Sequence, residues 1–206
     1  IDFEFVPPQD RTALNTFMED LYRRLSPNYI VTISVPAKIS DDPRHPFSGA
    51  FDYKTLSMFS DELFILAYDE HFSIPGPIAS IGFVRQVLNF AITQVPRQKI
   101  KLGMAAYGYS WAIDGGMPQT LSFQEAIDLA VENQATIRYD QVAEEPTFTY
   151  TTPEGGEYIV WFENARSFSA KLDLVLEFNL GGIAVWRLGQ EDPMIWVVIR
   201  NKLRTA

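Results

Sequence analysis

Short hydrophobic segments alternate with amphipathic segments along most of this chain, and this alternation limits the possible folds more than any other feature. The hydrophobic segments are IDFEF (1–5), YIVTISVP (29–36), ELFILAYD (62–69), KIKLGMAAYGY (99–109) and GIAVW (182–186). Nearly continuous hydrophobic runs of this length are typical of strands in a parallel sheet that is covered on both faces. The sequence therefore predicts an α/β fold.

Each of these strands is followed by a segment with helical signals. The expected helices cover about 10–25, 53–60, 80–95 and 165–178, and a last one begins with Asp192 as N-cap and Pro193 in the first helical position. Helices between parallel strands imply right-handed crossovers. Two architectures satisfy this pattern, a doubly wound sheet and a (β/α) barrel.

The rhythm changes between about residues 111 and 162. Ser122 and Glu125 form a capping-box pattern at the start of one helix. Three short strand-like segments follow, TIRYD, TFTYTT and EYIVWF, and the EGG between the last two favours an antiparallel hairpin. We therefore expect one domain over residues 1–206 that contains an inserted α+β module at 111–162.

Composition narrows the range of partners. The net charge of −9 disfavours nucleic acid and anionic membranes, and no apolar run is long enough to span a bilayer. The chain has no cysteine, which excludes thiolate chemistry, and only two histidines, which leaves few ligands for a metal site. We therefore expect neither metal nor cofactor. No glycine-rich phosphate loop is present either. A neutral or weakly charged substrate fits this composition best.

Asp2 and Glu4 form the first candidate pair for catalysis. Their i, i+2 spacing on a strand places both carboxyl groups on one face, while Phe3 and Phe5 face the other side. Neighbouring carboxylates push their proton affinities apart, so that one can act as an acid while the other stays ionised. A solvated or salt-bridged pair is the alternative, and the residues alone leave the two readings about even.

Polar and aromatic residues also follow other strands. Tyr68 and Asp69 end one strand, Tyr107 lies near the end of the next, and Trp186 ends the last. The carboxyl ends of parallel strands are the edge at which α/β proteins bind ligands, and an indole or phenol ring can stack against a sugar. Each of these residues could instead fill the core or cap a turn.

Several ordered motifs resemble those of family 18 glycoside hydrolases, the chitinase family. IDFEF resembles the end of the family's DxxDxDxE signature, AYDEH resembles its M-x-Y-D strand with Leu66 in place of methionine, and LGMAAYGYSW and GGIAVWRLG resemble its seventh and eighth strands. Within the family, DFEFVPPQDR, VWFENARS and WRLGQED are most similar to bacterial spore-cortex and peptidoglycan enzymes, which often carry LysM modules. The resemblance covers essentially the whole chain.

The resemblance implies a fold as well as a family. It implies that the chain is the C-terminal part, strands 4 to 8, of a (β/α)8 TIM barrel, with the α+β insertion after strand 7. The catalytic domain would then be N-terminally truncated at Ile1, with three strands and the first two aspartates of the signature preceding it.

The resemblance also implies a retaining, substrate-assisted mechanism for cleaving β-1,4 bonds next to N-acetylglucosamine. Glu4 would protonate the leaving oxygen, and Asp2 would orient the substrate's acetamido group. Tyr68 would hydrogen-bond that group, Asp69 would contact the sugar, and Trp186 would form the floor. The expected substrate is peptidoglycan of the cell wall or spore cortex, outside the cell. A chitinase and a non-catalytic glycan-binding protein on the same scaffold remain alternatives.

Overall fold

The computed structural model describes residues 1–204, which divide into two compact units. The first unit combines residues 1–67, 85–103 and 177–184, and the second combines 68–84, 104–176 and the chain from 185 onward. Two sheets account for all strands in the described part of the chain.

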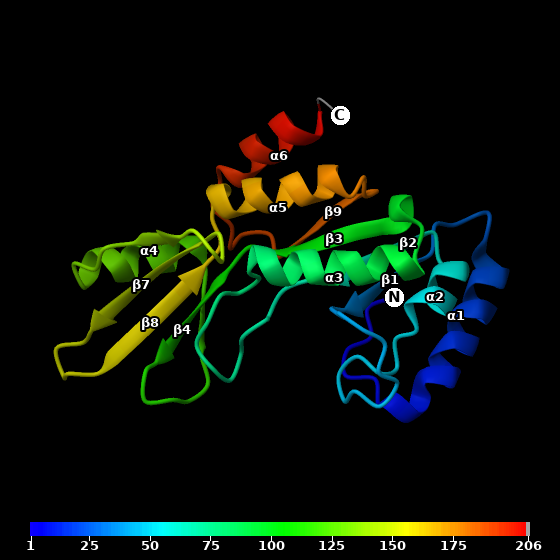
Figure 1. Cartoon of the computed structure of the whole chain (residues 1–206), viewed down its shortest axis with the longest axis horizontal. Helices are drawn as coiled ribbons and strands as arrows, with labels where there is room; N and C mark the ends of the chain where they lie inside the picture. The colour runs from blue at the N-terminus through cyan, green and yellow to red at the C-terminus, as the bar shows by residue number, and fades with distance from the viewer. Residues whose placement is uncertain (205–206) are drawn as a thin grey trace. The chain divides into compact units, whose positions relative to one another are not determined.

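The first sheet has four strands in the order β1-β2-β3-β9 (Figure 1). The strands are β1 (Thr32–Pro36), β2 (Glu62–Leu66), β3 (Ile100–Ala105) and β9 (Gly182–Trp186). β1, β2 and β3 pair in parallel, with Ile33 opposite Leu63 and Ile65 opposite Leu102. These four side chains are fully buried, as the hydrophobic runs predict.

Five helices lie close to the predicted places along the chain. They are α1 (Arg11–Leu25), α2 (Tyr53–Met58), α3 (Ile81–Gln94), α5 (Ala165–Glu177) and α6 (Ile195–Leu203), with short 3-10 helices at Pro8–Asp10 and Arg97–Lys99. Of these, α2, α3 and α6 directly follow β1, β2 and β9. The capping signals have a local basis in α2, where the Asp52 side chain accepts a hydrogen bond from the Thr55 amide.

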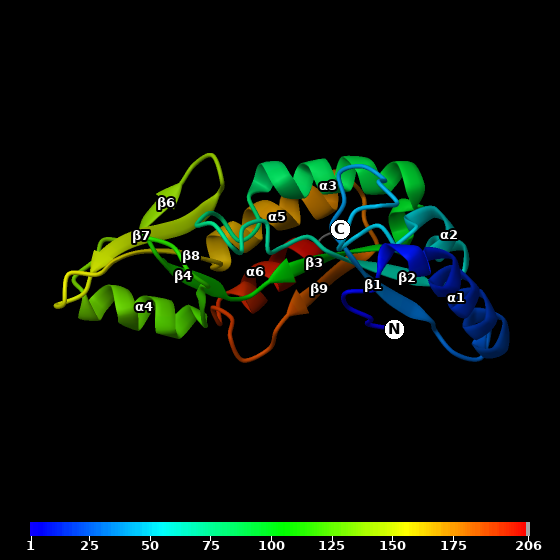
Figure 2. The same cartoon turned by 90° about the horizontal axis from the view of Figure 1, so that it is seen from below.

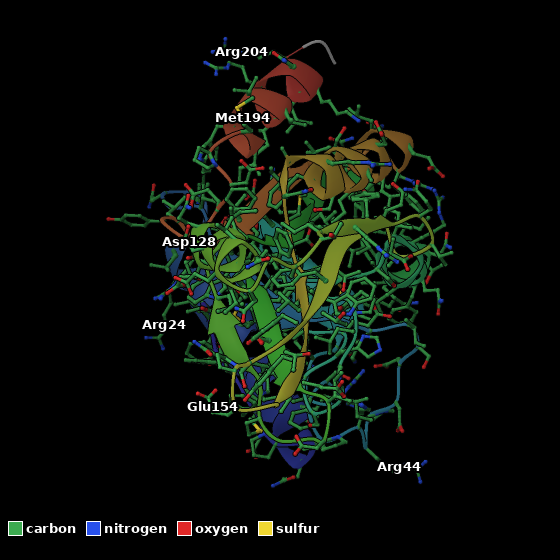
Figure 3. The ribbon with its side chains drawn as sticks, turned by 90° about the vertical axis from the view of Figure 1, so that its left-hand side faces the viewer. Arg24, Arg44, Asp128, Glu154, Met194 and Arg204 are labelled. Carbon is green, nitrogen blue, oxygen red and sulfur yellow. The ribbon has the colours of Figure 1, made fainter. Side chains whose placement is uncertain are left out.

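The predicted start of the last helix is wrong by two residues. α6 begins at Ile195 instead of Pro193. Asp192 is occupied in a turn, because its carboxylate accepts hydrogen bonds from the amides of Met194 and Ala165. Figure 3 shows the side chains of Met194 and Arg204, which flank α6, pointing outward.

The opening segment is not the buried strand that the sequence suggested. Only the main chain of Ile1 pairs with β1, with its nitrogen donating to the Thr32 oxygen at 2.7 Å and its oxygen accepting from the Ser34 amide at 2.9 Å. This is the bonding pattern of a parallel pair. Phe5 then adopts a positive φ of 54°, so the chain turns before a strand can continue.

The strand expected at 99–109 is in fact two strands in two sheets. β3 ends at Ala105, and β4 (Gly108–Ala112) begins the second sheet. Gly108 lies opposite Phe162, and a Cβ at Gly108 would lie 2.4 Å from the Phe162 Cβ. The close approach of the neighbouring strand therefore requires glycine where the chain changes sheets.

The second sheet has the order β5-β4-β8-β7-β6 and pairs antiparallel. Its other strands are β5 (Gln119–Leu121), β6 (Arg138–Asp140), β7 (Glu145–Thr151) and β8 (Glu157–Phe162). Helix α4 (Phe123–Glu132) carries the predicted capping box and packs on this sheet (Figure 2). The helix and the hairpin expected inside 111–162 are both present, although the sheet starts at Gly108.

No helix among residues 1–204 is long and apolar enough to cross a membrane.

Candidate active site

The first unit carries the two candidate carboxylates, Asp2 and Glu4. Both side chains are exposed, directly after the residue that bonds to β1. Phe3, between them, packs on the α1 ring of Phe17 with the ring centroids 5.5 Å apart. Phe5 contacts the loop residue Phe47, with the ring centroids 6.3 Å apart. The alternation therefore holds over Asp2 to Glu4, with the aromatic ring on the helix and both carboxylates open to solvent.

The second unit holds a cluster around Asp69, just past the end of β2. Asp69 has a positive φ of 55°, a conformation that aspartate tolerates better than most residues. Its Oδ1 accepts hydrogen bonds from the Tyr107 hydroxyl at 2.5 Å and the Tyr109 hydroxyl at 2.8 Å. Two converging donors fix the orientation of this carboxylate.

The environment keeps both phenols protonated. Burial, together with the nearby Asp69 carboxylate, raises the pKa of Tyr107 and of Tyr109 well above the usual value for tyrosine. Both hydroxyls therefore remain donors to Asp69 at physiological pH.

Aromatic rings surround these hydrogen bonds. Tyr68 meets Tyr107 edge-on with the centroids 6.2 Å apart, and Tyr109 contacts both Phe72 and Trp111. The Trp111 indole nitrogen donates to the Phe72 carbonyl at 2.8 Å. Tyr107, Tyr109 and Trp111 are each 5% exposed or less, so they fill the core of this cluster. For Tyr107 this is the core-filling alternative that the sequence left open.

Trp186 differs from these buried rings because 52% of its surface is exposed. Its carbonyl accepts a hydrogen bond from the Ala106 amide at 2.7 Å, beside Tyr107. The main chain is thus held while much of the indole stays open, which suits a residue that stacks on a sugar.

The structure brings three of the predicted residues together, namely Tyr68, Asp69 and Tyr107. Sequence reasoning missed that Tyr109 is an equal partner of Asp69. The i, i+2 spacing of Tyr107 and Tyr109 was the available signal, since side chains at this spacing face the same way in an extended chain. Among residues 1–204, no group of three or more potential metal-ligating side chains is found.

Parallel strands with helices between them, and an aspartate and aromatic rings at the strand ends, define an α/β protein with a candidate ligand site at that edge of the sheet. The family model for glycosyl hydrolases family 18 matches residues 1–191. The chain belongs to this family, and its solved members have a TIM-barrel-type α/β fold. The resemblance found in the sequence motifs is therefore confirmed.

Among its relatives is the cortical fragment-lytic enzyme of Bacillus subtilis (strain 168), which is 37% identical over 214 residues, covering 100% of this chain and 49% of the relative. Two solved structures are also similar. The Bacillus cereus spore cortex-lytic enzyme SleL is 35% identical with a TM-score of 0.91, covering 98% of this chain and 48% of that one. A chitinase from Chromobacterium violaceum is 35% identical with a TM-score of 0.92, covering 98% and 64%. The chain spans about half the length of the curated relatives it matches.

Proposed function

We propose that the protein containing this chain is a glycosidase that cleaves β-1,4 bonds next to N-acetylglucosamine in peptidoglycan of the cell wall or spore cortex. One observation carries the proposal. The family match runs through residues 1–191, starting at the Asp2 and Glu4 motif, and the relatives that are 35% or more identical include enzymes named for cortex lysis. Such a protein would act outside the cell, at the cell wall or spore envelope.

We further propose that residues 1–206 supply strands 4 to 8 of a (β/α)8 barrel, with the segment 111–162 inserted after strand 7. The parallel bonds of Ile1 to β1 and the strand order β1-β2-β3-β9 support this arrangement, because they give five neighbouring segments in chain order. In this numbering Ile1 begins strand 4 and β9 is strand 8.

The proposed mechanism is retaining and substrate-assisted. Glu4 protonates the leaving oxygen while the substrate's own acetamido oxygen attacks the anomeric carbon, and Glu4 then activates water for the second step. Asp2 orients the acetamido group, Tyr68 hydrogen-bonds it, and Asp69 contacts the sugar. Because no enzyme carboxylate becomes the nucleophile, the usual relation between carboxylate separation and stereochemistry does not apply.

Two further residues have proposed roles at the sugar site. Trp186 forms the floor of the sugar site, a role that its half-exposed indole supports. Tyr107 was expected to touch substrate, and its hydroxyl is instead committed to Asp69 at 2.5 Å. We therefore propose that Tyr107 acts on the sugar through the Asp69 carboxylate.

The Glu4→Gln variant tests the catalytic assignment. It keeps the size of the side chain and removes the proton donor, so we expect turnover by the full-length protein to fall at least about 100-fold, as loss of general acid catalysis predicts. Oligosaccharide binding, measured by calorimetry, should stay within a few-fold. Unchanged turnover would refute Glu4 as the acid, and loss of binding together with turnover would point to a glycan-binding role for this residue.

A chitinase is the second candidate, because the chitinase from Chromobacterium violaceum is as similar in fold as the cortex-lytic enzyme. Muropeptides and chitin oligomers, incubated separately with the full-length protein, distinguish the two by the masses of their products. Cleavage of chitin alone would overturn the peptidoglycan assignment. Binding of either glycan without cleavage would favour a non-catalytic protein on the same scaffold.

A further inference from the structure

A buried cluster of three charged side chains lies in the second unit, apart from the residues with proposed catalytic roles. It consists of Glu145 at the start of β7, Glu163 just after β8 and Lys171 in α5, each at most 2% exposed. The Lys171 Nζ lies 2.7 Å from Glu163 Oε1 and 3.2 Å from Glu145 Oε1. Buried charges are costly unless they are paired, so a cluster of this kind calls for an explanation.

Glu145 and Glu163 differ in the hydrogen bonds that they accept from groups other than Lys171. Its Oε2 accepts a hydrogen bond from the Ile78 amide and its Oε1 one from the Ala79 amide, both at 2.8 Å. Glu163 instead accepts from the Ser167 hydroxyl within its own region of the chain. One carboxylate at the start of β7 therefore anchors a loop that lies 66 and 67 residues earlier in the sequence.

The anchored loop is the one that begins with Asp69. The Glu70 amide donates to the Ile78 carbonyl at 3.0 Å, and the Glu70 Oε2 accepts from the Ser80 amide at 2.7 Å, so the two ends of the loop are joined. Inside the loop the His71 ring lies against Gly76, where a Cβ would come within 2.4 Å of the ring. Loops with joined ends and their own side chains packed inside are compact units that are frequently functional.

The anchored residue Ile78 also reaches the partners of Asp69. Its side chain is fully buried in a cluster with Ala105, Tyr107, Tyr109 and Trp111. The Ile78 amide therefore bonds to Glu145, while its side chain belongs to the same buried cluster as the two tyrosines that donate to Asp69.

We propose that Glu145 is a positioning residue that holds the loop from Asp69 to Ser80 in the geometry the sugar site requires. Glu145 lies in the antiparallel sheet of the second unit, so that sheet takes part in shaping the site through a buried carboxylate. The effect of Glu145 on catalysis rests on the proposed glycosidase function. Its effect on the loop rests on the hydrogen bonds alone.

Burial and hydrogen bonding act on Glu145 in opposite directions. Burial, helped by the neighbouring Glu163 charge, raises the pKa of Glu145 to about 8, although Lys171 and the amides of Ala79 and Ile78 oppose the rise. Burial alone would lower the pKa of Lys171, and the charges of Glu163 and Glu145 outweigh it, so the pKa is raised. Three donors converge on the two oxygens of Glu145, and the ionised form is the one that satisfies all three.

Glu145→Gln and Glu163→Gln make a matched pair. Either variant removes one carboxyl group from the cluster, while Lys171 keeps the other glutamate as its partner. Glutamine offers one acceptor oxygen where glutamate offers two. Only Glu145→Gln therefore places an NH2 group opposite a loop N–H, so that one of the two hydrogen bonds to the loop is lost. The two variants therefore share their effect on the cluster and differ in their effect on the loop.

The experiment uses the full-length protein at a temperature well below the unfolding of each variant. Amide hydrogen exchange at Ile78 and Ala79 should be at least tenfold faster in Glu145→Gln and within threefold of the parent in Glu163→Gln. With glycan as substrate, kcat/KM should fall at least tenfold in Glu145→Gln only. If Glu145→Gln does not fold, Glu145→Asp keeps the charge beside Lys171 but is one methylene too short for both amides, and the same faster exchange is expected.

Two results would overturn the proposal. One is equal exchange at Ile78 and Ala79 in Glu145→Gln and Glu163→Gln, and the other is faster exchange in Glu145→Gln without any change in kcat/KM. If the parent protein cleaves no glycan, the proposed function fails, and the exchange measurement alone then decides whether Glu145 holds the loop.

Discussion

The hydrogen bond from Tyr107 to Asp69 allows a quantitative test of the site geometry. The Tyr107→Phe variant deletes the hydroxyl and leaves the ring packing unchanged. A buried hydrogen bond to a charged acceptor is worth roughly 1.5–3 kcal/mol, against about 0.5–1.5 kcal/mol for a neutral acceptor. The side chain is 4% exposed and the bond is 2.5 Å long, so we expect the free energy of unfolding to fall by about 2 kcal/mol.

Tyr53→Phe is the matched control. Tyr53 is 2% exposed and its hydroxyl donates at 2.5 Å to the neutral Pro36 carbonyl, so burial and bond length match while the charge does not. We expect this variant to lose only about 1 kcal/mol, as for a neutral acceptor. Urea unfolding of both variants at pH 7 measures the difference.

A double-mutant cycle isolates the charge itself. In an Asp69→Asn background the same Tyr107→Phe change should cost only about 1 kcal/mol, because the acceptor is now a neutral amide. The reasoning is refuted if Tyr107→Phe destabilises no more than Tyr53→Phe, or if its effect is the same with asparagine at position 69.

Two further predictions concern the fold. Gly108→Ala should destabilise the protein by about 1–3 kcal/mol, because the new Cβ would lie 2.4 Å from the Phe162 Cβ. At Gly82 a new Cβ would have nothing within 4 Å, so Gly82→Ala should stabilise α3 by up to about 1 kcal/mol. Thermal unfolding measures both variants, and equal shifts would contradict the packing argument. Hydrogen bonds from Arg11 hold the pKa of Asp41 below its usual value, so the stability that this pair contributes is complete above pH of about 4 and is lost as the pH falls through the lowered pKa. The Asp41→Asn variant should therefore lose less stability than the parent when the pH falls from neutral to acid. A pH profile of stability that is unchanged in the variant would argue against a stabilising Arg11–Asp41 pair.

Local signals in the sequence predicted most of the elements. Ser122 and Glu125 form the capping box as expected, and β9 has the predicted bounds, because caps and short hydrophobic runs depend on residues close in the sequence. The split after Ala105 was not predictable, since glycine is required at 108 by Trp161 and Phe162, more than 50 residues later. The opening strand failed for a related reason, because strand formation depends on neighbouring strands as well as on hydrophobic alternation.

For the candidate site, the sequence predicted which residues end the strands but not what they contact. Tyr68 and Asp69 were identified from their position alone, and the family motifs supported them. The partners of Asp69 come from 38 and 40 residues away, and Glu145 carries no sequence signal beyond its being a glutamate next to a proline. Contacts over such separations depend on tertiary packing, which no local pattern encodes.

The two tyrosines that hold Asp69 lie on different sides of the change between sheets. Tyr107 precedes β4, while Tyr109 is inside β4 and pairs with Trp161 of β8. One oxygen of Asp69 thus accepts a hydrogen bond from the segment that leaves the first sheet and another from the second sheet itself. A change in the second sheet that displaces β4 would remove one of the two donors while leaving the other. The antiparallel sheet therefore influences the orientation of Asp69 directly, through the hydrogen bond from Tyr109. It also acts indirectly if, as proposed, Glu145 positions the loop that begins with Asp69.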